Sequence, residues 1–178
     1  MLIVKFIPNL FSLFRIFCIP FLLYSLLNQN RLSAFLILSI GAISDFLDGY
    51  LARKFHVESK LGELLDPLAD KLFSNSVLWG LYFSISPTLP ILLVAILLTL
   101  RDLVLLFGAF VVIFKKIPVN IKPVYISKIC TTVIFIYIIL LTIIDSSNIY
   151  LSIIGYSCLV LVALTFFVYI KRFFENKI

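Results

Sequence analysis

Residues 44–71 read SDFLDGYLARKFHVESKLGELLDPLADK, an acidic and basic stretch between two apolar runs. Asp45 and Asp48 close the first run, and Asp66 and Asp70 open the second. Residues three or four apart share one face of an α-helix. The short loop between the runs therefore predicts two antiparallel helices whose acidic faces meet at one end.

The composition around this stretch indicates an integral membrane protein. The chain has 178 residues, of which 62% are hydrophobic and 13% charged. A soluble domain is roughly half apolar and about 25% charged, and a small fold has too much surface to bury a larger apolar share. We expect one all-α domain, residues 1–178, with much of its apolar surface facing lipid.

The apolar runs predict six transmembrane helices, each near the ~20 residues that cross a bilayer. Residues 1–9 precede them as an interfacial segment. Asn, Gln, Ser and Pro residues mark several of the breaks between runs. The predicted spans are Leu10–Leu27, Leu32–Arg53, Gly62–Ile85, Thr88–Phe114, Val124–Ile144 and Ile149–Phe173.

Basic residues gather on one side of this predicted topology. The opposite side holds Arg31, while Arg15 and Arg101 lie within spans. Because cytoplasmic loops are enriched in Lys and Arg, both termini are expected in the cytoplasm. Charges scattered over membrane loops also argue against a nucleic-acid partner. The cytoplasmic set is Lys5, Arg53, Lys54, Lys60, Lys71, Lys115, Lys116, Lys122, Lys128, Lys171, Arg172 and Lys177.

Four carboxylates in one small volume repel one another and need a neutralising partner. Mg²⁺ favours carboxylates together with substrate phosphates, and two ions about 3.5–4 Å apart can bridge a pyrophosphate. The residues thus predict a polar, metal-binding cavity near the cytoplasmic face. Intramembrane carboxylates also mark cation pathways, so a cation-binding transporter remains an alternative at this point.

The neighbours of the aspartates carry a resemblance to a known family. Eight positions within 26 residues resemble the signature of the CDP-alcohol phosphatidyltransferases: Asp45, Asp48, Gly49, Ala52, Arg53, Gly62, Asp66 and Asp70. The order and spacing match that signature without departure. The six apolar runs fit the same family over nearly the whole chain.

The resemblance implies a reaction and roles for these residues. A phosphatidyl group passes from CDP-diacylglycerol to an alcohol, and CMP is released. Asp45, Asp48, Asp66 and Asp70 hold Mg²⁺ or Mn²⁺, as two ions, and Asp70 is also the general base on the acceptor hydroxyl. The family tends to form homodimers. The residues that line the CDP site are Asp48, Gly49, Ala52, Arg53 and Gly62.

Further motifs bear on the acceptor alcohol. IPNLFSLFRI at residues 7–16 resembles members that accept glycerol-based alcohols. Three motifs look more like those of CMP-forming cardiolipin synthases than those of phosphatidylglycerophosphate synthases. They are Arg101-Asp102, then Lys122-Pro123, and then the Ile-Ser-Lys that ends at Lys128. Phosphatidylglycerol is the expected acceptor and glycerol 3-phosphate the alternative, with the acceptor phosphate held by Arg101, Lys122 and Lys128. An N-terminal transit peptide is not recognisable, which favours a bacterial inner membrane.

Overall fold

Over the residues that it describes, the structure, a computed structural model, contains six α-helices. It describes residues 7–55, 62–84, 87–114, 125–144 and 148–175, and the side chains of residues 12–44, 68–84, 87–108, 125–144 and 148–171. The chain divides into two compact units, Met1–Ile85 and Ser86–Ile178. Each unit contains three of the helices, and each is described by itself below.

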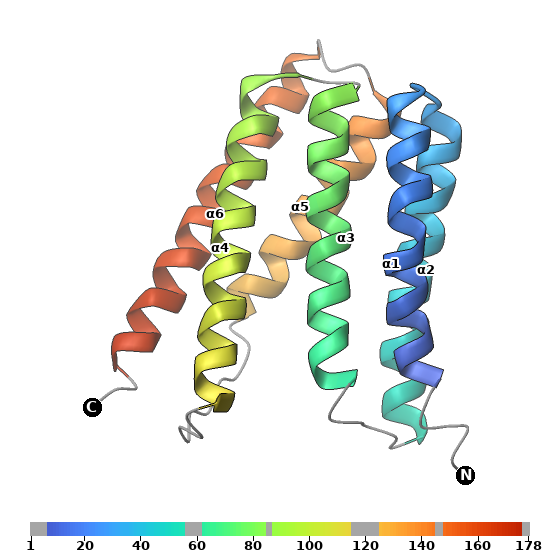
Figure 1. Cartoon of the computed structure of the whole chain (residues 1–178). Helices are drawn as coiled ribbons and strands as arrows, with labels where there is room; N and C mark the ends of the chain where they lie inside the picture. The colour runs from blue at the N-terminus through green and yellow to red at the C-terminus, as the bar shows by residue number, and fades with distance from the viewer. Residues whose placement is uncertain (1–6, 56–61, 85–86, 115–124, 145–147, 176–178) are drawn as a thin grey trace. The chain divides into compact units, whose positions relative to one another are not determined.

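The first unit contains α1 (Ile7–Leu27), α2 (Arg31–Phe55) and α3 (Gly62–Ser84). The chain ascends in α1, returns in α2 and ascends again in α3, as Figure 1 shows. The predicted antiparallel arrangement of α2 and α3 is therefore confirmed. The helix α1 packs against both of them, so it is the central element of the unit.

A tight turn joins α1 to α2 and sets their antiparallel direction. Gln29 adopts the left-handed backbone conformation with φ of 55°. Its N–H donates to the Leu26 carbonyl at 2.9 Å, and the Asn30 N–H donates to the Ser25 carbonyl at 2.9 Å. These two bonds form a Schellman motif, which satisfies carbonyls at the end of a helix. The Asn30 side chain then accepts from the Ser33 N–H at 3.1 Å and caps α2.

Apolar side chains fill the interface around α1. A Cβ atom added at Gly80 of α3 would lie 2.7 Å from Leu26 Cδ1 and 2.8 Å from Leu23 Cδ2, so α1 and α3 approach closely there. On α2, a Cβ at Gly41 would lie 2.6 Å from Phe73 Cζ of α3. Further buried side chains of this core are Leu22, Ala34, Leu38, Ala69, Val77, Leu78 and Leu81.

The second unit contains α4 (Leu89–Phe114), α5 (Tyr125–Ile143) and α6 (Ile149–Glu175). The helix α6 packs against both α4 and α5. At Gly155 of α6, an added Cβ would lie 2.5 Å from the Tyr137 hydroxyl oxygen of α5 and 2.8 Å from Pro90 Cβ of α4. This glycine thus marks the place where all three helices of the unit meet.

Each predicted helix end lies within three residues of the observed one, the largest difference being Leu10 against Ile7. Residues 7–9, predicted as part of an interfacial segment, belong to α1, and residues 1–6 lie outside the described residues. Among the residues described, three segments are long and apolar enough to cross a membrane: Leu89–Gly108, Tyr125–Ile143 and Ile149–Lys171. Two shorter apolar segments are Ser12–Leu27 and Arg31–Ser44.

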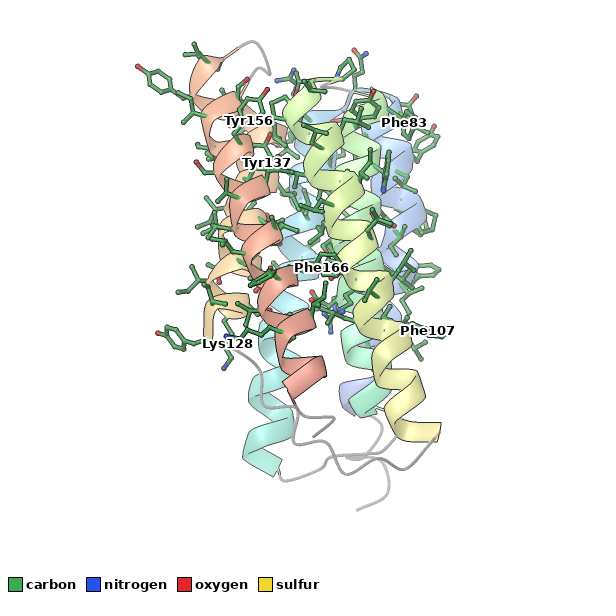
Figure 2. The ribbon with its side chains drawn as sticks, turned by 90° about the vertical axis from the view of Figure 1, so that its left-hand side faces the viewer. Phe83, Phe107, Lys128, Tyr137, Tyr156 and Phe166 are labelled. Carbon is green, nitrogen blue, oxygen red and sulfur yellow. The ribbon has the colours of Figure 1, made fainter. Side chains whose placement is uncertain are left out.

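Large apolar side chains also cover the outer faces of the helices. Phe17 and Tyr24 of α1 and Phe167 of α6 are exposed. Figure 2 shows Phe83 and Phe107, which are likewise exposed, projecting outward from α3 and α4. Exposed large apolar side chains in such number are typical of helices that contact lipid or another protein. With the three long apolar helices, they support a membrane protein.

The close packing at Gly155 leads to a test against a second glycine. Gly155→Ala places a methyl group against Tyr137 and Pro90, whereas Gly108 has nothing within 4 Å of an added Cβ. Both changes gain helix propensity of about 1 kcal/mol, but only the first overpacks, which typically costs about 1–3 kcal/mol. We expect the thermal unfolding midpoint of detergent-purified Gly155→Ala to fall below that of Gly108→Ala. Equal midpoints would contradict the packing of Gly155 described above.

Candidate functional site

The four aspartates lie at one end of the first unit. Asp45 and Asp48 belong to the second half of α2, and Asp66 and Asp70 to the first half of α3. Because α2 and α3 are antiparallel, these two helix segments lie at the same end of the unit (Figure 1). The side chains of Asp45, Asp48 and Asp66 lie outside the described ones. The backbone thus supports an acidic end.

The other signature residues share these helix segments. Gly49, Ala52 and Arg53 lie in α2 after Asp48, and Gly62 is the first residue of α3. All four therefore belong to the same end of the unit as the aspartates. Their side-chain surroundings lie outside the described residues, and their assignment to a CDP site stays a prediction.

Of the four signature aspartates, Asp70 is the one whose side chain lies among the described residues. Its side chain is 57% exposed and lies on α3 between two buried neighbours, Ala69 and Phe73. The Asp70 carbonyl oxygen accepts a hydrogen bond from the Ser74 hydroxyl at 2.8 Å. The carboxylate is thus open on one side, as a group that binds a metal ion or takes a proton from a substrate needs to be.

A buried arginine lies behind this carboxylate. Arg15 of α1 is 1% exposed, and its Nη1 atom lies 3.8 Å from Asp70 Oδ1. The sequence identified Arg15 as a charge within an apolar run but did not connect it with the acidic end. Charged residues inside membrane helices face the protein interior and pair with other polar groups, so the position of Arg15 in an apolar run was the signal in the sequence for a polar partner inside the protein.

The donor set at the acidic end fits a hard divalent cation. Asp70 offers an accessible carboxylate, and the other three signature aspartates supply the same oxygen donors that Mg²⁺ prefers. In the part of the chain whose side chains are described, there is no group of three or more candidate metal-binding residues. Asp45, Asp48 and Asp66 do not belong to that part, so the metal site stays a proposal.

Arg101 lies in the second unit and forms a buried ion pair with its chain neighbour. It is 4% exposed, and Asp102 is equally buried. Arg101 Nε and Nη2 donate to Asp102 Oδ1 at 3.0 Å and 2.8 Å. On its other edge, Nη1 lies 3.5 Å from the Thr165 hydroxyl of α6 and 3.6 Å from Cys130 Sγ of α5. The guanidinium thus joins side chains from α4, α5 and α6.

The predicted acceptor-binding residues differ in their surroundings. Lys128 projects from the first turn of α5 and is exposed (Figure 2). Arg101 has its structural partner in Asp102, and Lys122 lies outside the described residues. An acceptor-phosphate role for these three residues therefore stays a prediction. Asp102 was noted in the sequence only as part of a motif, and its pairing with Arg101 is a finding of the structure.

The sequence matches the CDP-alcohol phosphatidyltransferase family over residues 5–169. This region includes all eight signature positions and five complete helices, together with most of α6. The match was expected from the resemblance of residues 45–70 and extends to almost the entire chain.

Several named relatives are similar to this chain. A CDP-diacylglycerol–glycerol-3-phosphate 3-phosphatidyltransferase from Aquifex aeolicus is 40% identical over 111 residues, which are 62% of this chain and 61% of the relative. A CMP-forming cardiolipin synthase from Streptomyces coelicolor is 40% identical over 106 residues, covering 56% of this chain and 48% of the relative. The cardiolipin synthase of Rattus norvegicus is 31% identical over 143 residues, covering 71% and 46%. The match therefore spans about half to three fifths of these relatives.

The buried Arg101–Asp102 pair predicts a strong asymmetry between single and double substitution. Asp102→Ala leaves a guanidinium buried without its carboxylate, and breaking a buried ion pair in this way typically costs about 3–5 kcal/mol. The double change of Arg101→Met with Asp102→Leu removes both charges and is expected to regain most of that stability. Thermal unfolding of the purified variants measures both effects. A stable Asp102→Ala protein would show that this pair does not support the second unit.

Proposed function

The chain belongs to the CDP-alcohol phosphatidyltransferase family, and we propose that it transfers a phosphatidyl group from CDP-diacylglycerol to a glycerol-based alcohol with release of CMP. The observation that carries this proposal is the acidic end of the first unit. There the eight signature residues lie in the parts of α2 and α3 that share one end of the unit, and the Asp70 side chain is 57% exposed.

The proposed step is a displacement at the lipid-linked phosphorus. Asp70 accepts the proton of the acceptor hydroxyl, as a positioned carboxylate can. The acceptor oxygen forms a bond with the phosphorus that carries the diacylglycerol, and the bond from that phosphorus to the bridging pyrophosphate oxygen breaks. CMP leaves with the bridging oxygen. The exposure of Asp70 supports this role, because a general base needs direct access to the substrate.

Asp45, Asp48, Asp66 and Asp70 are the proposed ligands of Mg²⁺ or Mn²⁺, as two ions. When bound, such ions supply positive charge that stabilises the pyrophosphate and the departing CMP. The residues proposed to bind the CDP moiety follow the same helix ends: Asp48, Gly49, Ala52, Arg53 and Gly62. Small side chains at positions 49 and 52 leave room for a bulky nucleotide close to the α2 backbone.

Phosphatidylglycerol is the acceptor that we propose, which makes cardiolipin the product. Its phosphate would be held by Arg101, Lys122 and Lys128. The motifs Arg101-Asp102 and Ile126-Ser127-Lys128 support this choice, and so do the relatives named as cardiolipin synthases. Glycerol 3-phosphate is the second candidate. It is favoured by the Aquifex aeolicus relative, named as a glycerol-3-phosphate phosphatidyltransferase, which matches 62% of this chain at 40% identity.

The proposed setting is a bacterial inner membrane. Six helices would cross the bilayer, with both termini in the cytoplasm, in a homodimer. The three long apolar helices and the exposed apolar side chains support membrane insertion. The one-sided distribution of Lys and Arg in the sequence supports the orientation.

The general-base assignment predicts that Asp70→Asn abolishes turnover while the protein keeps its fold. The amide has almost the shape of the carboxylate but cannot take the hydroxyl proton. CMP release by purified enzyme, supplied with CDP-diacylglycerol, acceptor and Mg²⁺ or Mn²⁺, measures turnover, and the unfolding midpoint monitors the fold. Full activity of Asp70→Asn would rule out Asp70 as the general base. Ion flux in vesicles without any CMP release from the wild-type protein would favour a cation transporter.

The acceptor is tested by identifying the lipid product. Reactions with CDP-diacylglycerol and either phosphatidylglycerol or glycerol 3-phosphate should yield cardiolipin from the former. In the same assay, Lys128→Gln should raise the KM for phosphatidylglycerol far more than the KM for CDP-diacylglycerol, because this exposed lysine is proposed to hold only the acceptor phosphate. Phosphatidylglycerophosphate as the sole product would identify glycerol 3-phosphate as the acceptor instead. The proposed roles of the aspartates would stay unchanged. Equal effects on both KM values would remove Lys128 from the acceptor site.

A further inference from the structure

Arg15 is a buried charged group to which the proposed reaction assigns no task. It is the largest of the fully buried side chains, at 1% exposed, and it lies in the apolar sequence of α1. Placing a guanidinium on an apolar membrane-type helix is unfavourable unless polar groups compensate it. An uncharged side chain of similar size would fill the same space without that penalty. The charge of Arg15 therefore points to a specific use.

The contact between Arg15 and Asp70 is strongly one-sided. Nη1 of Arg15 lies 3.8 Å from Oδ1 of Asp70, and the side chains are 2% and 57% exposed, respectively. At this distance the contact is an ion pair rather than a hydrogen bond. The buried guanidinium thus contacts the carboxylate from the protein interior, and Asp70 keeps a solvent-exposed surface.

The helix packing keeps this arrangement in place. Within α1, Ser12 and Cys18, about one turn to either side of Arg15, are both buried. Further along the helices, Leu23 and Leu26 of α1 pack against Gly80 of α3. The cation is thus enclosed by packing, whereas the Asp70 side chain that it contacts is 57% exposed. A fixed positive charge favours the rotamer that brings the carboxylate towards it.

We propose that Arg15 is a positioning residue that holds the Asp70 carboxylate in the orientation needed to take the acceptor proton. Because Arg15 is almost completely buried, it acts through Asp70 and not by touching a substrate. This inference rests on the proposed phosphatidyltransferase function. It adds α1 to a site that the signature residues place on α2 and α3 alone.

The test compares Arg15→Met with Arg15→Lys. Met fills the apolar site without a charge, and the Asp70 carboxylate that loses its partner is 57% exposed, so water can solvate it. We expect Arg15→Met to keep an unfolding midpoint close to that of the wild type, whereas its kcat falls by about tenfold to a hundredfold, the scale of a misplaced reacting group. Both KM values should stay within about threefold. Arg15→Lys restores the charge and should recover part of kcat.

Arg31→Met is the matched control. Arg31 begins α2, at the opposite end of that helix from the acidic segment, so the same substitution there should leave kcat unchanged. Wild-type kcat in Arg15→Met would overturn the proposal. A loss of both kcat and folding in Arg15→Met that Arg15→Lys does not rescue would also overturn it, because that pattern indicates a purely structural residue.

A second measurement tests the pairing without relying on activity. The unfolding midpoints of Arg15→Met, Asp70→Asn and the double variant form a double-mutant cycle. We expect the Asp70→Asn change to have a different effect with and without Arg15. Additive effects would overturn the proposal even in an active enzyme. A wild-type protein that releases no CMP but shows this coupling would instead overturn the phosphatidyltransferase function and leave the pairing intact.

Discussion

A charge on an apolar helix has to meet another polar group inside the protein, and both units are organised around this constraint. On insertion scales, an Arg or Asp at the centre of a membrane helix costs about 2.5–3.5 kcal/mol. In the first unit, buried Arg15 lies against Asp70 across the α1–α3 interface. In the second, Arg101 pairs with Asp102 and reaches the side chains of α5 and α6. Among the described side chains, the interior of each unit is therefore an apolar core that contains a charged pair.

The two pairs differ in exposure, which separates their roles. Arg101 and Asp102 have side chains only 5% exposed each, and they meet at 2.8 Å. Through its contacts with Thr165 and Cys130, Arg101 also links α4 to α6 and α5, a structural role beside the acceptor contact proposed for it. The longer contact between Arg15 and Asp70 leaves the carboxylate open. An open carboxylate supported from behind by a cation suits a reacting group, because its negative charge stays available while its position is constrained.

Much of the fold could be predicted from the sequence, since apolar runs of about 20 residues and polar breaks locate helices directly. The Asn28-Gln29-Asn30 break became the turn between α1 and α2, and the short link after Phe55 brought the acidic ends of α2 and α3 together. The membrane assignment of α1 and α2 rests on the sequence more than on the structure, because their described apolar segments are shorter than those of α4, α5 and α6. Gly155 gave no sign in the sequence that it lies between Tyr137 and Pro90.

The sequence alone determined the chemical class. Eight signature positions depend on local spacing along two neighbouring helices, and such spacing can be counted without coordinates. Only the tertiary structure decided which charges meet. Arg15 and Asp70 are 55 positions apart in the chain, and Arg101 reaches Cys130 and Thr165 on two other helices. Helix packing selects among such partners by rotating each helix about its axis, and that rotation depends on side-chain shapes across the whole interface.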